Sequence, residues 1–157
     1  MIKETSAGVV VFRIEQSKVL YLLLNYPTGH WDFVKGKTEK GESLGETVVR
    51  EAKEETGISD ITFVDGFEEW VRYRFQYEGE LVSKKVLYFL GRTNTSDIVL
   101  SFEHLDYAWV EYHEALKKIT YKNSKNVLAK SKKWLKRFPS MLESGDISGH
   151  KLPNRHH

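Results

Sequence analysis

One short amphipathic helix restricts the fold of this chain more than any other segment. Residues 44 to 56 are predicted to be helical, because Ser43 can cap the N-terminus with Glu46 as capping-box partner and Gly57 ends the helix. One stripe of this helix is apolar: Leu44, Val48 and Ala52. A helix with such a stripe is stable when another layer of structure covers it.

The polar face of this helix carries three glutamates. At about 100° per residue, Glu51, Glu54 and Glu55 lie within an arc of roughly 100°, so their carboxylates repel one another. Neither Glu51 nor Glu54 has a lysine or arginine four residues later. A divalent cation would relieve the repulsion, and Arg50 could orient the Glu51 carboxylate. The alternative is an ordinary acidic helix face that water solvates.

The absence of cysteine narrows the kind of metal. With no cysteine in 157 residues, the chain forms no disulfide and offers no thiolate ligand. Carboxylate, imidazole and carbonyl ligands favour Mg²⁺, with Mn²⁺ as a substitute.

Apolar and β-branched runs predict strands on both sides of the acidic helix. The first two runs are separated by a polar turn and are expected to pair as a hairpin, and a turn at residues 78 to 80 joins two later strands. The predicted strands are Ala7–Ile14, Val19–Asn25, Ile61–Val64, Trp70–Tyr77, Lys84–Gly91 and Tyr107–Val110.

Two helices are predicted after the strands, at Glu111–Lys118 and Ser124–Phe138. The second has a stripe that suits burial: Val127, Leu128, Ser131, Trp134, Leu135 and Phe138. This order of elements predicts an α+β fold, with a mixed β-sheet sandwiched between α-helices. We expect a single domain over residues 1–140 and a flexible tail over residues 141–157.

Charge and hydropathy restrict the partners. The net charge of +2 is too small to require a nucleic-acid or membrane partner, and the lysines and arginines between Lys117 and Arg137 are typical of a solvated helix face. The longest apolar run, Val19–Leu24, is far shorter than the roughly 20 residues that span a bilayer, and the N-terminus lacks the apolar core of a signal peptide. We expect a cytoplasmic protein and favour a monomer.

The acidic residues follow a family motif. Residues 36 to 58 fit the pattern Gly-x5-Glu-x7-Arg-Glu-U-x-Glu-Glu-x-Gly-U, in which U is apolar. The specified positions are Gly36, Glu42, Arg50, Glu51, Ala52, Glu54, Glu55, Gly57 and Ile58. This segment resembles the Nudix box at every specified position. The resemblance implies the Nudix fold and hydrolysis of a nucleoside diphosphate linked to another moiety, with water attacking a phosphorus.

The same resemblance assigns roles within the box. It implies that Glu51, Glu54 and Glu55 bind the metal ions, with the Lys35 carbonyl as a further ligand. Arg50 would position Glu51, and bound metal would lower the pKa of the attacking water.

Two other glutamates have less certain roles. Glu42 would be structural or an outer ligand by the resemblance. Glu103 precedes a predicted strand and is a candidate for the base that takes the proton of the water, the alternative being an exposed glutamate in a loop.

Segments outside the box resemble asymmetrical diadenosine tetraphosphate hydrolases. The similar segments are Gly8–Phe12, His30-Trp31 before Lys35-Gly36, Lys84–Phe89, Glu103-His104-x2-Tyr107-x-Trp109 and Tyr121-Lys122. The resemblance implies that Lys84, His30 and Lys35 contact the polyphosphate. It also implies that Tyr73 and Tyr121 stack on an adenine. The alternatives are a core-facing strand residue for Tyr73, helix packing for Tyr121 and a turn cap for His30.

Two positions depart from that family. Its members usually carry proline where this chain has Val34 and Lys40, both in the predicted substrate loop. The change would affect the rigidity of the loop or the substrate preference, because the carboxylates of the box are intact.

Three functions follow from these observations. The leading one is Mg²⁺-dependent hydrolysis of diadenosine tetraphosphate, a dinucleoside polyphosphate, to ATP and AMP. The first alternative is a pyrophosphohydrolase acting on 5′-triphosphate RNA or nucleoside triphosphates, to which the lysine-rich C-terminal helix would lend affinity. The second is a catalytically silent, nucleotide-sensing Nudix domain, against which the complete set of box glutamates argues.

Overall fold

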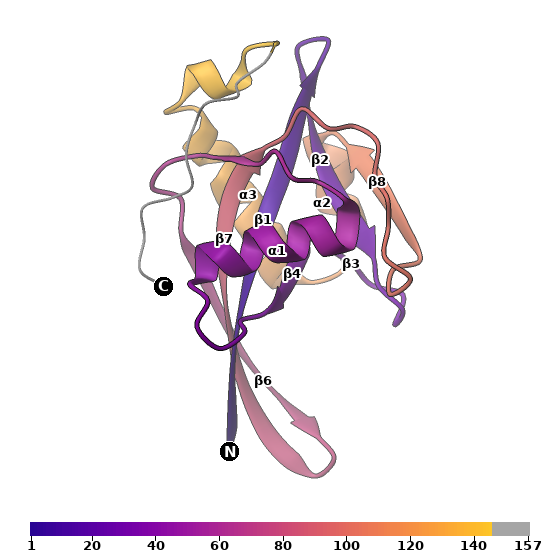
Figure 1. Ribbon diagram of the computed structural model, residues 1–157, viewed down its shortest axis with the longest axis vertical. Coiled ribbons are helices and arrows are strands. Elements are labelled where there is room, and N and C mark those ends of the chain that lie inside the picture. Colours follow the sequence, from indigo (N-terminus) through magenta and orange to yellow (C-terminus); the bar gives the residue numbers. More distant parts are fainter. Residues whose placement is uncertain (146–157) are drawn as a thin grey trace.

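The computed structural model describes residues 1–145, which form one mixed sheet of eight strands between helices (Figure 1). The strands are β1 (Ile2–Glu15), β2 (Lys18–Asn25), β3 (Trp31–Asp32), β4 (Val34–Lys37), β5 (Thr62–Phe63), β6 (Glu69–Tyr77), β7 (Glu80–Arg92) and β8 (Asp106–Val110). The helices are α1 (Leu44–Thr56), α2 (Tyr112–Lys118), α3 (Lys122–Leu135) and the 3-10 turn η1 (Pro139–Leu142).

The sheet is organised around β1. Along one edge β1 pairs in parallel with β7, and the other strand pairs in the described chain are antiparallel. Two strands share the opposite edge, with β4 paired to Ser6–Val9 and β2 paired to Phe12–Glu15. The sheet therefore divides at the middle of β1, and β4 stands apart from β2.

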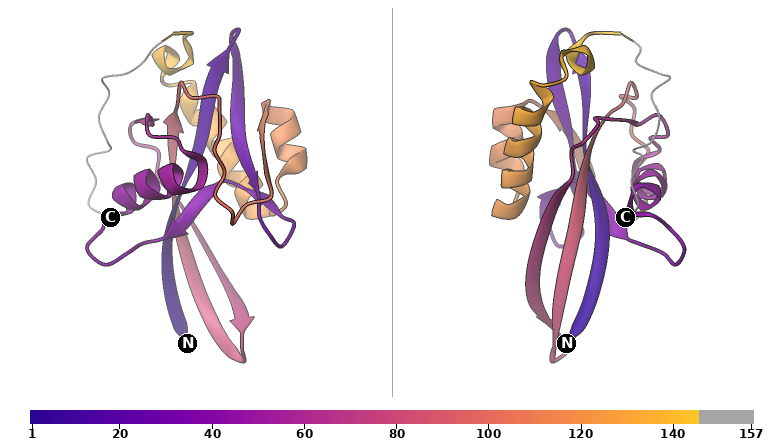
Figure 2. Two further views of the ribbon diagram at one scale, coloured as in Figure 1. Left: turned by 45° about the vertical axis from the view of Figure 1, so that its right-hand side comes forward. Right: turned by 90° about the vertical axis from the view of Figure 1, so that its left-hand side faces the viewer.

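Each face of the sheet has its own apolar core, because successive residues of a strand point to opposite faces. Val9 and Val11 of β1 pack under α1 together with its predicted stripe. Val10 and Phe12 pack with residues of α2 and α3. Figure 2 shows α1 on one side of the sheet and α2 and α3 on the other. The predicted α+β sandwich is confirmed.

One end of the sheet projects beyond the helices as an arm. It consists of the start of β1 and the hairpin of β6 and β7, which lies at the bottom of Figure 1. Glu78 and Gly79 form the tip of the hairpin with positive φ angles of 50° and 82°. In this register Tyr73 lies beside Lys84.

Several predicted element boundaries were wrong. β1 begins at Ile2 rather than Ala7, because its polar start continues to pair with β7. Residues 31–34, for which no strand was predicted, contain β3 and the start of β4. The last helix begins at Lys122 and ends at Leu135, and Phe138 precedes the 3-10 turn that begins at Pro139.

The chain from η1 to residue 145 packs on the rest of the domain. Met141 is buried, and the Arg92 guanidinium donates hydrogen bonds to the carbonyl oxygens of Met141 (3.2 Å) and Gly145 (2.7 Å). The rest of the predicted tail, residues 146–157, lies outside the described residues. Among residues 1–145, the helices are too short or too polar to cross a membrane.

Candidate active site

The caps of α1 fix how its carboxylates are presented. Ser43 Oγ accepts a hydrogen bond from the Glu46 amide (3.1 Å), and Glu46 Oε1 accepts one from the Ser43 amide (2.8 Å), so the predicted capping box is present. Gly57 ends the helix with a φ of 78°. The bounds of α1 match the prediction.

The absence of a side chain at Gly36 lets α1 approach β4 closely. A Cβ atom at Gly36 would lie 2.2 Å from Glu51 Cδ, well inside van der Waals contact. The Glu51 carboxylate therefore lies directly against the β4 backbone. This close contact explains why the motif has glycine at position 36.

Arg50 is the centre of the ionic contacts on α1. Its Nε lies 2.6 Å from Glu42 Oε2, and its Nη1 lies 2.6 Å from Glu51 Oε1 and 3.3 Å from Glu54 Oε2. Its Nη2 also donates to the Lys37 carbonyl oxygen (3.1 Å). The contact with Glu51 follows the sequence-based expectation. The contact with Glu54 was missed, because only cations that follow a glutamate were considered.

Glu42 connects the loop that precedes α1 to the helix through hydrogen bonds. It accepts hydrogen bonds from Arg50, the Thr47 hydroxyl (2.9 Å) and the Glu39 amide (2.9 Å). The Arg50 hydrogen bond, helped by those from Glu39 and Thr47, lowers the pKa of Glu42 to about 2. Its contacts are those of a structural residue.

Glu55 is the buried member of the set. Its side chain is 6% exposed, and His104 Nε2 lies 2.9 Å from Glu55 Oε1. Among residues 1–145, neither His104 Nε2 nor Glu55 Oε2 has a hydrogen-bond partner. Burial, and then the adjacent Glu51 carboxyl, raises the pKa of Glu55. The charge of Glu103 acts in the same direction, so this exposed loop residue lies near the carboxylates.

Tyr26 links this buried pair to a second group of residues. Its ring stacks on His30 with centroids 4.7 Å apart and meets the His104 ring edge-on at 4.7 Å. The sequence analysis did not single out Tyr26. His104 was noted only as part of a motif.

The second group consists of His30, Lys35, Tyr73, Lys84 and Tyr121, which we call the cationic–aromatic cluster. Tyr121 is half-exposed at the N-cap of α3, and its ring lies 5.3 Å from that of His30. The structure thus brings together residues from four separate parts of the chain.

Burial and neighbouring charges shift the pKa values of the cluster. Lys35 Nζ lies 3.2 Å from Oδ2 of the buried Asp32, which the sequence analysis did not single out. Burial lowers the pKa of Lys35, but Asp32 and Tyr73 outweigh it, so the pKa is raised and the charge is retained. Burial, and then the charge of Lys35, lowers the pKa of Lys84. His30 has a lowered pKa because of burial.

β4 connects the two groups. Lys35 and Gly36 are consecutive residues of this strand and therefore point to opposite faces. Gly36 contacts Glu51 on the α1 side, whereas Lys35 belongs to the cationic–aromatic cluster. A ligand that reaches both groups would pass around β4, where the sheet divides.

The carboxylates fit a divalent cation in their chemistry. Glu51, Glu54 and Glu55 offer carboxylate oxygens of the kind that divalent cations bind, and the buried Oε2 of Glu55 lacks a hydrogen-bond partner among residues 1–145. Among residues 1–145, no three acidic or histidine side chains are already arranged to hold a metal ion. Glu51 and Glu54 instead contact Arg50.

A sequence model of the NUDIX domain matches residues 3–131, which is most of the chain. This chain belongs to the Nudix family. The resemblance inferred from the box is thereby confirmed, and the protein is a Nudix hydrolase.

Two matches cover nearly the whole length of the similar protein, and a third covers a shorter segment. The chain is 33% identical over 138 residues to the asymmetrical bis(5′-nucleosyl)-tetraphosphatase of Caenorhabditis elegans, a match that covers 85% of this chain and 97% of the relative. The crystal structure of a C. elegans Ap4A hydrolase binary complex matches with a TM-score of 0.78 and 31% identity, covering 86% of this chain and 99% of that one. An RNA pyrophosphohydrolase of a Nitratiruptor species is 40% identical over 63 residues, which are 40% of this chain and 39% of that relative.

Proposed function

We propose that this Nudix hydrolase cleaves diadenosine tetraphosphate into ATP and AMP. The observation that carries the proposal is the cationic–aromatic cluster, placed across β4 from the carboxylates of α1. A polyphosphate with an adenine at its end needs cations for the phosphates and an aromatic face for the base. The two C. elegans matches, which cover most of the chain at 31–33% identity, carry the corresponding name.

Each group then has a task in the reaction. Lys35 and Lys84 neutralise phosphate oxygens, and Tyr73 and Tyr121 stack on the adenine. Arg50 holds the Glu51 carboxylate in place through its hydrogen bond of 2.6 Å. These contacts orient the polyphosphate against the carboxylates.

Glu51, Glu54 and Glu55, with the Lys35 carbonyl, would hold the divalent cation. Nudix hydrolases generally use divalent cations such as Mg²⁺. A bound cation supplies charge neutralisation at the phosphates and a lower pKa for the attacking water. Glu103, whose charge contributes to the raised pKa of Glu55, would take the proton of that water as the water oxygen bonds to phosphorus and one phosphoanhydride P–O bond breaks.

A pyrophosphohydrolase acting on 5′-triphosphate RNA or nucleoside triphosphates is the second candidate. The partial match to an RNA pyrophosphohydrolase and the lysines of α3 favour it. It would use the same carboxylates on a different leaving group.

The test is the identification of products by ion-exchange chromatography. The protein is incubated with diadenosine tetraphosphate and Mg²⁺, with and without EDTA, beside 5′-triphosphorylated RNA and ATP. Equal amounts of ATP and AMP, abolished by EDTA, are expected. Turnover of RNA ends or ATP alone would overturn the proposed substrate, and no turnover of any substrate would leave a nucleotide-sensing domain.

A further inference from the structure

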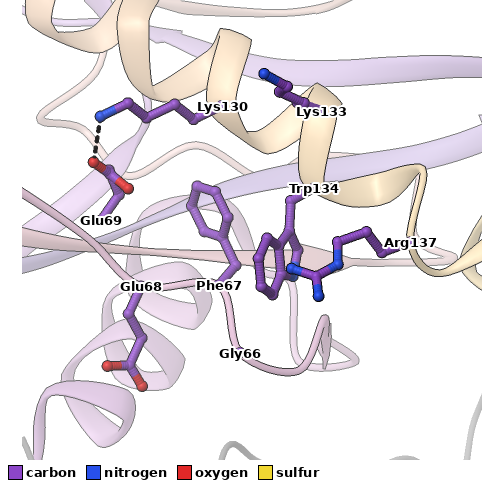
Figure 3. A pocket seen from close by; sticks show the side chains of 8 residues that line it. All are labelled: Gly66, Phe67, Glu68, Glu69, Lys130, Lys133, Trp134 and Arg137. Carbon is purple, nitrogen blue, oxygen red and sulfur yellow. Dashed lines mark hydrogen bonds and ion pairs between the residues drawn. The ribbon is translucent and has the colours of Figure 1, made fainter.

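A groove runs between α3 and the edge strand β6, on the other side of the sheet from the carboxylates of α1. Its wider part is a cavity of about 360 Å³ between Gly66–Glu69 and the end of α3 (Figure 3). A second cavity of about 170 Å³ shares Glu69 and Lys130 with the first and extends to Asn123. The two cavities share the Glu69–Lys130 ion pair in their linings, and we call them together the β6–α3 groove, which spans about 20 Å at the rise of an α-helix.

The wide end of the groove combines aromatic rings with cations. Trp134 and Phe67 lie with ring centroids 6.4 Å apart, and the Arg137 guanidinium lies 4.3 Å from the Trp134 ring centroid. Figure 3 shows both rings between the loop and α3, with Arg137 beside Trp134. Lys130 is paired with Glu69 at 2.6 Å, whereas Lys133 has no ion pair among residues 1–145. Glu68 and Glu69 also line the cavity, so its three cations exceed its carboxylates by one. Such a lining suits a flat ring joined to an anion.

The charges of the chain are strongly divided between its two helical layers. Residues 115–142 contain nine of the 24 lysines and arginines and none of the 22 aspartates and glutamates. This segment therefore carries a formal charge of +9, and the rest of the chain carries −7. Although the net charge is small, the layer that contains α3 is basic, and it lies on the other side of the sheet from the acidic α1. A polyanion complements this layer.

The narrow end of the groove lies near the candidate active site. Asn123 lines it, two residues after Tyr121 of the cationic–aromatic cluster. Asn123 and Asn126 are exposed there, and their amides can donate and accept hydrogen bonds. The 2′-hydroxyl of a ribose is a suitable partner for such amides.

We propose that the β6–α3 groove binds single-stranded RNA. Lys133 and Arg137 contact backbone phosphates, Lys130 does so when it exchanges Glu69 for a phosphate, and a base packs against the Trp134 ring at the wide end. A single strand can enter a concave groove of this size with its bases unstacked from one another, and it carries the charge that the basic layer complements. The proposal concerns binding alone and holds whether or not diadenosine tetraphosphate is the substrate.

The test is fluorescence anisotropy with a labelled 5′-hydroxyl RNA of 12 nucleotides in EDTA, so that no 5′-phosphate and no cleavage contributes. The groove variant is Lys133→Glu with Arg137→Glu, and the control is Lys132→Glu with Lys136→Glu on the same helix but outside the groove lining. Both change the net charge by the same amount. Thermal unfolding and far-UV circular dichroism check that each variant is folded.

The parent protein is expected to bind the RNA with an affinity that falls as salt rises. The groove variant should bind the RNA about tenfold more weakly than the parent. Its slope of log K against log salt should be shallower by about 1.4, because each of the two lost phosphate contacts reduces the slope by about 0.7. The control should stay within about threefold of the parent. An equal loss in both variants would overturn the groove as the site, and an absence of RNA binding by the parent, with or without binding to anionic vesicles, would overturn the proposal itself.

Discussion

The carboxylates of α1 and the cationic–aromatic cluster lie on either side of β4, yet they are built in different ways. The carboxylates come from one helix, and a single arginine, Arg50, contacts two of them. The cluster takes His30, Lys35, Tyr73, Lys84 and Tyr121 from distant parts of the chain, brought together by strand register and by the start of α3.

This difference suggests a division of labour. Residues fixed on one helix hold the geometry that bond cleavage needs, whatever leaving group is present. Residues that come from several elements can be exchanged one at a time, which suits the selection of a substrate. Substitutions in the two regions should therefore have different kinetic signatures.

The largest effect is expected from Glu54→Gln. The amide keeps the shape of the side chain but removes the negative charge that the proposed cation requires, so kcat should fall by about 10³-fold. Steady-state kinetics with diadenosine tetraphosphate measures it. Glu114→Gln on α2 is the matched control, because it removes the same charge at an exposed position outside the site. Activity of Glu54→Gln equal to that of this control would remove the carboxylates from the mechanism.

A substitution at Gly36 should separate folding from activity. In Gly36→Ala the new Cβ would lie 2.2 Å from Glu51 Cδ, and the end of that flexible side chain can move aside at small cost to stability. Its displacement from Arg50 should lower kcat by about 10²-fold. Gly45→Ala is the control, since the nearest atom would be 4.0 Å away. It should keep full activity and stabilise α1 by about 0.5–1 kcal/mol. Full activity of Gly36→Ala would show that the close contact with β4 is unnecessary.

Two adjacent lysines of β7 offer a sharper comparison. Lys84 points to the cationic–aromatic cluster, whereas Lys85 lies on the other face with its Nζ 5.0 Å from the Trp70 ring centroid. Lys84→Gln should raise KM for diadenosine tetraphosphate by about tenfold with kcat nearly unchanged, because a phosphate contact is lost. Lys85→Gln should change neither constant by more than about twofold. Equal effects of both would contradict the assignment of Lys84.

The smallest effect concerns stability rather than turnover. Glu42→Gln removes the negative charge and replaces one of the two oxygens that accept hydrogen bonds from Arg50 with an amide nitrogen. It should lower the free energy of unfolding by about 1–2 kcal/mol at pH 7, given partial exposure. The pKa of Glu42 in the folded protein, about 2, is below its ordinary value of 4.5. Its stabilisation is therefore complete above pH 4.5 and is lost as pH falls through about 2. Urea unfolding at several pH values should show the parent and variant converging in that window, and a constant difference would contradict it.

The comparison also explains what the sequence could reveal. α1, its capping box and the crowding of Glu51, Glu54 and Glu55 follow from spacing within 15 residues, so they were predictable from local rules. The contact of His104 with Glu55 and the stacking of Tyr26 on His30 depend on how loops return to the sheet. No local periodicity encodes such contacts. The positions of Lys84 and Tyr121 were accessible only by resemblance to a family.

Strand pairing explains most of the other features that the sequence analysis did not predict. β1 begins five residues earlier than predicted, because polar residues such as Lys3 and Glu4 gain their place in the sheet from pairing with β7. The division of the sheet between β2 and β4 is likewise a property of the whole sheet. Patterns of hydrophobicity do not record which strands share an edge.

The measurement that tests the division of labour most directly is isothermal titration calorimetry with a methylene-bridged, non-hydrolysable analogue of diadenosine tetraphosphate in EDTA. Without metal, binding reports on the cationic–aromatic cluster alone. Glu54→Gln should bind the analogue within about twofold of the parent, and Tyr121→Ala should bind about tenfold more weakly through loss of base stacking. The opposite pattern, with binding lost in Glu54→Gln and retained in Tyr121→Ala, would contradict the separation of chemistry from recognition.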